Sequence, residues 1–173
     1  SDKEIAYCLW DRTLCKGGGY ALFPLNPKSR FKAHWSIRRQ SAGRYSYDGD
    51  NPADDRVRVI DGVLVTEAKG LPLKVGADSD AEWIAYARGK LLLVKYYPYF
   101  ASGDYTDGGN SVEFYCDNRV AELEPLSPES RLKPNENYAF PEKWVLIQLE
   151  SEVTSPEAAR SLVRKIPPSP FKN

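Results

Sequence analysis

A pair of glutamates near residue 120 is the part of the sequence best suited to acid and base chemistry. Glu122 and Glu124 lie two positions apart in the run Val120-Ala121-Glu122-Leu123-Glu124-Pro125-Leu126. Alternate side chains of an extended strand share a face, so both carboxylates would point the same way, roughly 7 Å apart. Two such acids can shift each other's pKa and divide general acid and general base work. The alternative is an exposed sheet face on which both carboxylates are only solvated.

A third acid lies close to this pair along the chain. Glu113 belongs to the run Ser111-Val112-Glu113-Phe114-Tyr115, and Asp117-Asn118-Arg119 separates this run from the next. If the two runs pair as a hairpin over that turn, Glu113 comes close to the glutamate pair.

Six basic residues with no acid among them occupy positions 28–44, and the aromatic Phe31 and Trp35 are interleaved with them. Such a patch is typical of a site for phosphate, nucleic acid or an acidic sugar. The acidic segment Tyr47–Asp55 follows directly and would neutralise it. The whole chain has 24 basic and 24 acidic residues, so the general attraction of a basic protein to polyanions is absent. We therefore expect no nucleic-acid partner.

Residue types that bind metals or act as nucleophiles are few. Cys8, Cys15 and Cys116 lack the CxxC spacing of a zinc site; we expect free thiols, with one bridge and a leftover thiol as the alternative. The acidic loop around Asp48 lacks the ligand spacing of an EF-hand calcium site. The run Lys16-Gly17-Gly18-Gly19 lacks the ending of a phosphate-binding loop. The sequence therefore predicts no metal and no cofactor.

Most of the chain is predicted to form β-strands, because short runs rich in Val, Ile, Tyr, Trp and Leu recur between clusters of Gly, Pro, Asn and Asp. Turn signals at Asp61-Gly62 and Arg88-Gly89-Lys90 predict two hairpins. The expected fold class is therefore all-β, an antiparallel β-sandwich. The predicted strands are Ile5–Leu14, Tyr20–Phe23, His34–Arg39, Val57–Ile60, Val63–Glu67, Glu82–Arg88, Leu91–Tyr97, Ser111–Cys116, Val120–Leu126 and Lys143–Glu150.

One short helix is predicted near the C-terminus. Ser155 is a candidate N-cap, Pro156 suits the first helical position, and the helix would run to about Lys165. We expect residues 1–150 to form the sandwich domain and residues 151–173 to form a helix and a surface tail. No apolar run approaches the roughly 18 residues needed to cross a bilayer, so no membrane span is expected.

Four segments together carry a resemblance to a known family. They are residues 19–31 (GYALFPLNPKSRF), 74–80 (KVGADSD), 107–113 (DGGNSVE) and 122–128 (ELEPLSP), and Trp144 follows within EKWVL. These segments resemble a bacterial family of domains of unknown function that is distantly similar to aldose 1-epimerases, the galactose mutarotase-like proteins. The resemblance covers about Ile5 to Glu150. It implies a supersandwich of two large antiparallel sheets with a carbohydrate-binding cleft on a concave face.

The resemblance also implies roles for individual residues. Leu123-Glu124-Pro125 is similar to the Leu-Glu-Thr-Gln context of the epimerase base, so Glu124 would take the proton of the anomeric hydroxyl. His34, the only histidine, or a lysine would protonate the ring oxygen, and Glu122 would face the same cleft. This chemistry needs no cofactor, and a carbohydrate is the expected ligand. The residues expected to bind substrate are Trp35, Arg38, Asn26, Lys74 and Asp107.

Two other functions remain open from the sequence. One is a non-catalytic carbohydrate-binding or structural assembly module, with sugar rings stacked on Trp35, Tyr97 and Tyr99. The other is a cleft for an anionic ligand, formed around Arg30, Arg38 and Arg39.

The chain contains no methionine, so Ser1 is not expected to be a native translation start. All-β sandwiches can reach roughly 200–250 residues as one domain, and the resemblance therefore favours a chain that is only the C-terminal part of the supersandwich. The partner expected to complete the sheets is either a missing N-terminal segment or a homo-oligomer. The sequence does not decide the compartment; of the possible locations, a bacterial periplasmic or secreted one is favoured.

Overall fold

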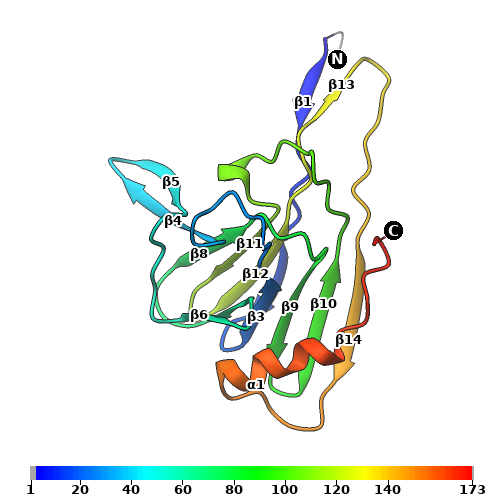
Figure 1. Cartoon of the computed structure of the whole chain (residues 1–173). Helices are drawn as coiled ribbons and strands as arrows, with labels where there is room; N and C mark the ends of the chain where they lie inside the picture. Colours follow the sequence, from blue (N-terminus) through cyan, green and yellow to red (C-terminus); the bar gives the residue numbers. More distant parts are fainter. Residues whose placement is uncertain (1–2, 173) are drawn as a thin grey trace.

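Two antiparallel sheets of six strands each pack face to face in the computed structural model, which describes residues 3–172 (Figure 1). Sheet 1 contains, from edge to edge, β14 (Lys143–Gln148), β10 (Leu91–Tyr96), β9 (Trp83–Arg88), β3 (Tyr20–Pro24), β7 (Val63–Glu67) and β6 (Val57–Ile60). Sheet 2 contains β2 (Thr13–Lys16), β12 (Val120–Pro125), β11 (Val112–Cys116), β8 (Leu73–Ala77), β4 (Ser36–Ser41) and β5 (Arg44–Asp48). A two-stranded ribbon of β1 (Ile5–Tyr7) and β13 (Ser130–Leu132) projects from one end. The predicted all-β antiparallel sandwich is confirmed.

Apolar side chains fill the space between the two sheets. Phe23 and Ile84 of sheet 1 belong to the same fully buried cluster as Phe114 and Leu123 of sheet 2. Every second residue of these strands points into this core, so the residues between them face outward. For sheet 2 this alternation turns a set of charged side chains to the outer face of the sandwich.

The predicted C-terminal helix is present and covers the outer face of sheet 1. It begins as α1 (Pro156–Ser161) and continues as the 3-10 turn η2 (Leu162–Lys165) (Figure 1). Ser155 Oγ accepts a 3.1 Å hydrogen bond from the N–H three residues ahead, as an N-cap does. Ala159 of the helix packs with Leu22 in a second apolar cluster on this side of sheet 1. The molecule therefore has three layers, with sheet 1 in the middle.

The two hairpins predicted from turn signals are present, and so is the third, which places Glu113 beside the glutamate pair. At the β6–β7 turn Asp61 and Gly62 both have positive φ, 46° and 72°, which suits a tight hairpin turn. At the β11–β12 turn Asp117 Oδ1 accepts hydrogen bonds from the N–H groups of Arg119 and Val120.

The strand pattern differs from the expectation in two respects. The structure contains three strands that the pattern does not predict, β5, β8 and β13. The whole of β8 is buried although Lys74 and Gly76 interrupt its apolar run, and this interruption hides the strand in the sequence. The expected strand Ile5–Leu14 is broken into β1 and β2, and Trp10 between them makes an isolated bridge to Leu126.

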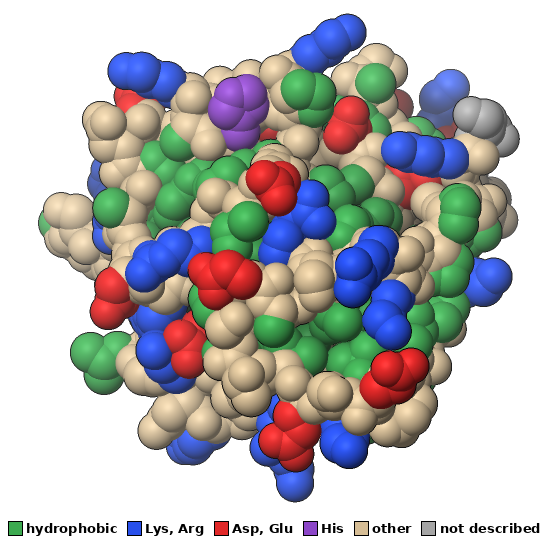
Figure 2. Space-filling view, turned by 60° about the horizontal axis from the view of Figure 1, so that its bottom comes forward, with side chains coloured by type: hydrophobic (Ala, Val, Ile, Leu, Met, Phe, Trp, Pro, Cys, Tyr) green, Lys and Arg blue, Asp and Glu red, His purple; other side chains and the backbone are tan. Residues whose placement is uncertain are grey.

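The outer face of sheet 2 is hollowed because β4 leaves the sheet. β4 is six residues long but pairs with β8 only at Ser36 and Ile37. The remainder of β4 pairs with β5 in a hairpin that projects from the body (Figure 1). Charges on the molecule are mixed: acidic and basic side chains are interspersed on the face shown in Figure 2, in keeping with the net charge of zero.

Candidate functional site

A buried lysine lies between two buried glutamates on the outer face of sheet 2. Lys74 Nζ is 2.9 Å from Glu124 Oε2 and 2.7 Å from Glu113 Oε2. The strand register explains the cluster, because Glu113 and Glu124 are directly opposite each other on β11 and β12, and β8 is the next strand. Glu124 is only 1% exposed, so the alternative in which this carboxylate is only solvated is wrong.

Trp10 closes the cluster from the segment between β1 and β2. Its indole Nε1 donates a 2.7 Å hydrogen bond to Glu124 Oε2, and Lys74 Nζ lies 4.2 Å from the centre of its ring. The two contacts hold both charged groups at once, one by a hydrogen bond and one by a cation–π interaction. The other oxygen, Glu124 Oε1, is buried and has no hydrogen-bond partner within residues 3–172.

Glu113 is held by a chain of neutral side chains behind the ion pairs. Asn110 Nδ2 donates to Glu113 Oε1 at 2.9 Å, and Ser36 Oγ donates to Asn110 Oδ1 at 2.9 Å. Asn110 needs the space beside β8 that Gly76 leaves empty, since a Cβ there would lie 2.6 Å from Asn110 Cγ. The glycine that interrupts β8 therefore makes room for the residue that orients Glu113.

Burial decides the protonation behaviour of the cluster. Burial raises the pKa of Glu113 to about 7, although the ammonium of Lys74 opposes the shift. Burial also raises the pKa of Glu124, again against Lys74. Burial, and next the charge of Glu113, raises the pKa of the Tyr47 hydroxyl, so this phenol stays neutral. The Glu113 carboxyl therefore exchanges a proton near neutral pH, in the range used by general acids and bases.

A cavity of about 540 Å³ opens onto this cluster. Its size lies within the usual range for small-ligand pockets, and its walls combine aromatic rings with charged groups. Arg12 at the rim forms an ion pair with Glu122 at 3.6 Å. The lining residues are Trp10, Arg12, Arg38, Lys74, Tyr115, Glu122 and Glu124.

Four residues expected from the sequence come together in this cavity, namely Glu124, Glu122, Lys74 and Arg38. Their positions follow from strand alternation, because each faces outward from sheet 2. The β11–β12 hairpin brings Glu113 beside Glu124 and Lys74, as expected, although Glu113 does not line the cavity.

The other expected residues lie elsewhere, and the expectation of a shared cleft is corrected for them. Trp35 is 7% exposed and packs in the core between the sheets, because it precedes the outward-facing Ser36. His34 lies in the loop before β4, where its Nδ1 is 2.8 Å from the carbonyl oxygen of Asn26. Asn26 in turn donates to the carbonyl of Asp78 at 3.1 Å. His34 and Asn26 thus stabilise a loop rather than line the cavity.

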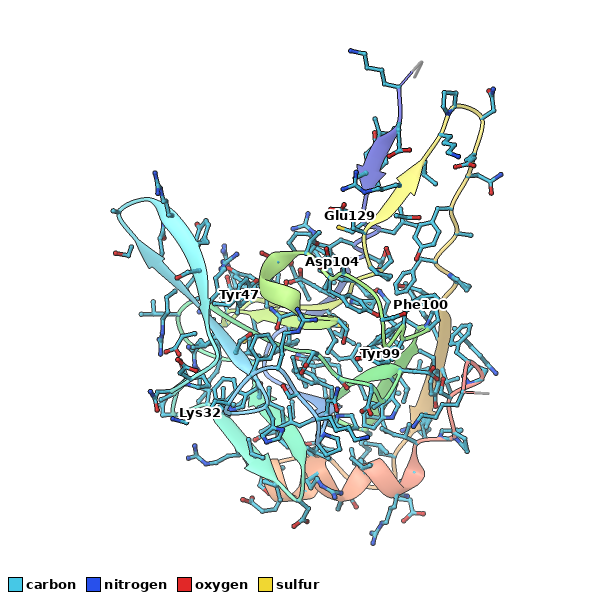
Figure 3. The ribbon with its side chains drawn as sticks, turned by 45° about the horizontal axis from the view of Figure 1, so that its top comes forward. Lys32, Tyr47, Tyr99, Phe100, Asp104 and Glu129 are labelled. Carbon is cyan, nitrogen blue, oxygen red and sulfur yellow. The ribbon has the colours of Figure 1, made fainter. Side chains whose placement is uncertain are left out.

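Asp107 reaches the cluster only through another residue. It begins the 3-10 turn η1 (Asp107–Gly109), and its Oδ2 accepts a 2.9 Å hydrogen bond from the Tyr47 hydroxyl. Figure 3 shows Tyr47 beside this turn, whereas Tyr99 lies toward the end of β10. Tyr99 stacks on Tyr105 with ring centres 5.9 Å apart, so its ring is not available in the cavity.

Trp10, Arg12 and Tyr115 are cavity residues that the sequence reasoning did not select. The signal was present for the first two, because Trp10 and Arg12 alternate with Asp11 and Thr13 in one extended segment. The missing information was which face of that segment meets sheet 2.

A second buried lysine lies on the opposite side of the same segment. Lys95 of β10 is fully buried; its Nζ contacts Asp11 Oδ1 and lies 2.8 Å from Thr13 Oγ1 and 3.2 Å from Glu142 Oε1. Asp11 and Thr13 therefore bind the segment of residues 10–13 to Lys95 of sheet 1, while Trp10 and Arg12 face the cavity.

Residues 3–172 show no metal site, no disulfide and no membrane-spanning helix. Within residues 3–172 no group of three or more His, Cys, Asp and Glu side chains could hold a metal ion. The three cysteines are free thiols, as expected. No helix in the described part of the chain is long and apolar enough to cross a membrane.

Comparison with known proteins gives no match. No protein-family model, curated protein or solved structure matches this chain. The functional interpretation therefore depends on the geometry of the cavity.

Proposed function

We propose that this protein binds a sugar in the cavity on sheet 2 and interconverts its anomers, as an aldose 1-epimerase does. The observation that carries the proposal is the state of the Glu124 carboxylate in the cavity wall. One of its oxygens is held by Trp10 and Lys74, and the other has no partner in the described residues. The similarity of Leu123-Glu124-Pro125 to the context of the epimerase base supports the same role.

The lining of the cavity suits a sugar ring. Trp10 and Tyr115 offer aromatic surface to the apolar face of a sugar, and both carry a polar group. Glu122 and Arg12 offer acceptors and donors to hydroxyl groups at the rim. A volume of about 540 Å³ is ample for a monosaccharide.

The proposed mechanism is proton transfer at the anomeric centre. The Glu124 carboxylate removes the proton from the anomeric hydroxyl while Lys74 Nζ gives a proton to the ring oxygen. The bond from C1 to the ring oxygen breaks, and C1 becomes the carbonyl carbon of an open-chain aldehyde. After rotation about the C1–C2 bond, the hydroxyl formed from the ring oxygen attacks the other face of C1. Lys74 recovers its proton from this hydroxyl, and Glu124 returns its proton to the anomeric oxygen. Lys74 takes the role expected of His34, because Lys74 lies in the cavity wall.

Polarimetry of freshly dissolved α-D-galactose tests the proposal. The wild type is expected to speed mutarotation above the buffer rate, Glu124→Gln to lose the acceleration, and Glu152→Gln, at an exposed position, to keep it. A wild type with no effect, or a fully active Glu124→Gln variant, would overturn the proposal.

A second function is favoured by one observation. Glu124 Oε2 accepts two donors at once, an arrangement that also occurs where a carboxylate only positions a ligand. In that case the protein is a sugar-binding module. Calorimetric binding of D-galactose without acceleration of mutarotation would identify this function.

A further inference from the structure

We propose that the sugar bound by this protein carries an anionic group, a carboxylate or a phosphate, and that Arg38 binds this group. The inference rests on the proposed sugar site and adds the class of sugar. The inference comes from the shape of the cavities on the outer face of sheet 2. It also comes from which charged side chains in these cavities already form ion pairs.

The sugar cavity continues into a second cavity of about 440 Å³. Arg38, Lys74 and Tyr115 line both, so the two form one groove across the outer face of sheet 2. We call the second cavity the notch; its lining residues are Ile37, Arg38, Arg39, Gln40, Tyr45, Asp54, Pro72, Leu73, Lys74 and Tyr115.

The notch exists because two strands separate. β4 pairs with β8 at Ser36 and Ile37 only, and from Arg38 onward it pairs with β5 alone. The start of β8 and the outer half of β4 therefore form opposite walls. Arg38 is the first residue beyond the paired region, which places it where the sugar cavity meets the notch.

Lys74 and Arg12, the other cations of the sugar cavity, are already engaged. Lys74 lies between two glutamates, and Arg12 pairs with Glu122 at 3.6 Å. Arg38 has no ion pair with a carboxylate of residues 3–172; its guanidinium lies 4.5 Å from the centre of the Tyr45 ring. The contact with the ring holds the guanidinium in place without using its N–H groups for a carboxylate of this part of the chain.

The notch itself has an excess of positive charge. Its acid, Asp54, is committed to Arg56 through a 2.8 Å ion pair, and the hydrogen bonds from Arg56 lower the pKa of Asp54 to about 2. Arg39 adds a second guanidinium and donates to the carbonyl of Ala53 at 3.5 Å. A guanidinium fork fits two oxygens of a carboxylate or a phosphate, so an anionic sugar substituent is the chemistry that this end of the groove matches.

Calorimetry with matched sugars tests the inference. The probes are D-galactose, D-galacturonate and D-galactose 6-phosphate, titrated into the wild type at low and moderate salt. At least one anionic sugar is expected to bind about tenfold or more tightly than D-galactose, with the difference reduced by salt. Preference for D-galacturonate identifies the group as a carboxylate, and preference for the phosphate ester identifies it as a phosphate.

Two variants assign the effect to one side chain. Arg38→Gln is expected to abolish the preference, so that this variant binds the anionic sugar and D-galactose with equal affinity. Arg44→Gln is the control, because Arg44 is exposed on the same hairpin and lines neither cavity. Equal binding of neutral and anionic sugars, or a preference that survives Arg38→Gln, overturns the inference and leaves the sugar site intact. Absence of binding by all three sugars overturns both.

Discussion

Trp10 donates a 2.7 Å hydrogen bond to Glu124 across 114 positions of sequence. The bond joins an otherwise exposed N-terminal segment to the carboxylate proposed as the base. It also fixes which oxygen of Glu124 is occupied and leaves the buried Oε1 without a hydrogen-bond partner among the described residues. The segment between β1 and β2 is therefore part of the site.

Trp10→Phe keeps an aromatic ring but removes this hydrogen bond. A hydrogen bond to a charged group is worth about 1.5–3 kcal/mol, and Trp10 is partly exposed, so we expect a loss of about 1–2 kcal/mol in the free energy of unfolding. Mutarotation should fall about tenfold because Glu124 loses its orientation. Urea unfolding and polarimetry measure the two effects. Trp144→Phe is the matched control, because the Trp144 indole donates a comparable, exposed hydrogen bond of 3.1 Å to Glu142. Equal losses of stability and of mutarotation rate in the two variants would contradict the role assigned to Trp10.

The raised pKa of Glu113 predicts a pH dependence of stability. The folded chain keeps this proton up to about pH 7, whereas the unfolded chain releases it near the ordinary value of 4.5. Between these values the folded state binds more protons, so the free energy of unfolding should decrease as pH rises from 5 to 7 and level off above it. Glu113→Gln should flatten this decrease, and Glu152→Gln should not. Parallel curves for Glu113→Gln and the wild type in urea unfolding would refute the prediction.

Lys74→Met should be strongly destabilising because it leaves two buried carboxylates facing each other. We expect a loss of at least about 3 kcal/mol at pH 8, as is typical when one partner of a buried ion pair is removed. The loss should be smaller at pH 5, where the carboxyls take up protons. Adding Glu113→Gln and Glu124→Gln to Lys74→Met should restore much of the stability. If the triple variant is no more stable than Lys74→Met, the loss comes from packing rather than from charge.

Lys95→Met should release the N-terminal segment from sheet 1. The change leaves the half-exposed Asp11 and the partly buried Glu142 without their shared ammonium, so we expect a loss of about 1–3 kcal/mol and faster amide hydrogen exchange at residues 10–13. Lys69→Met provides the comparison, because Lys69 forms a 2.7 Å ion pair with Glu67 on the surface, where solvent screens the charges, and its loss should change stability little. Similar effects of the two substitutions would count against the structural role of Lys95.

Local patterns predicted the parts of the site that depend on local geometry. Alternation placed Glu122 and Glu124 on one face, and turn residues predicted the hairpin that adds Glu113. The helix cap at Ser155 was equally local. Burial of Glu113 and Glu124 was not predictable in this way, because both carboxylates pair with Lys74, which comes from a distant part of the sequence.

The errors concern residues whose place depends on long-range packing. A strand containing Lys74 and Gly76 does not look buried until the partners of each are known. His34 was expected in the cleft because it is the only histidine and the resemblance requires an acid; the loop before β4 directs it to Asn26 instead. Trp10 was overlooked because nothing in its own segment shows which sheet that segment crosses.

The most direct test of the central claim is the rate of exchange between the α and β anomers of D-galactose at equilibrium, measured by NMR exchange spectroscopy near pH 7. We predict that the wild type raises this rate above that of buffer and that Glu124→Gln returns it to the buffer value while the protein remains folded. An unchanged rate with the wild type, or an equally raised rate with Glu124→Gln, would contradict the role of Glu124 as the base.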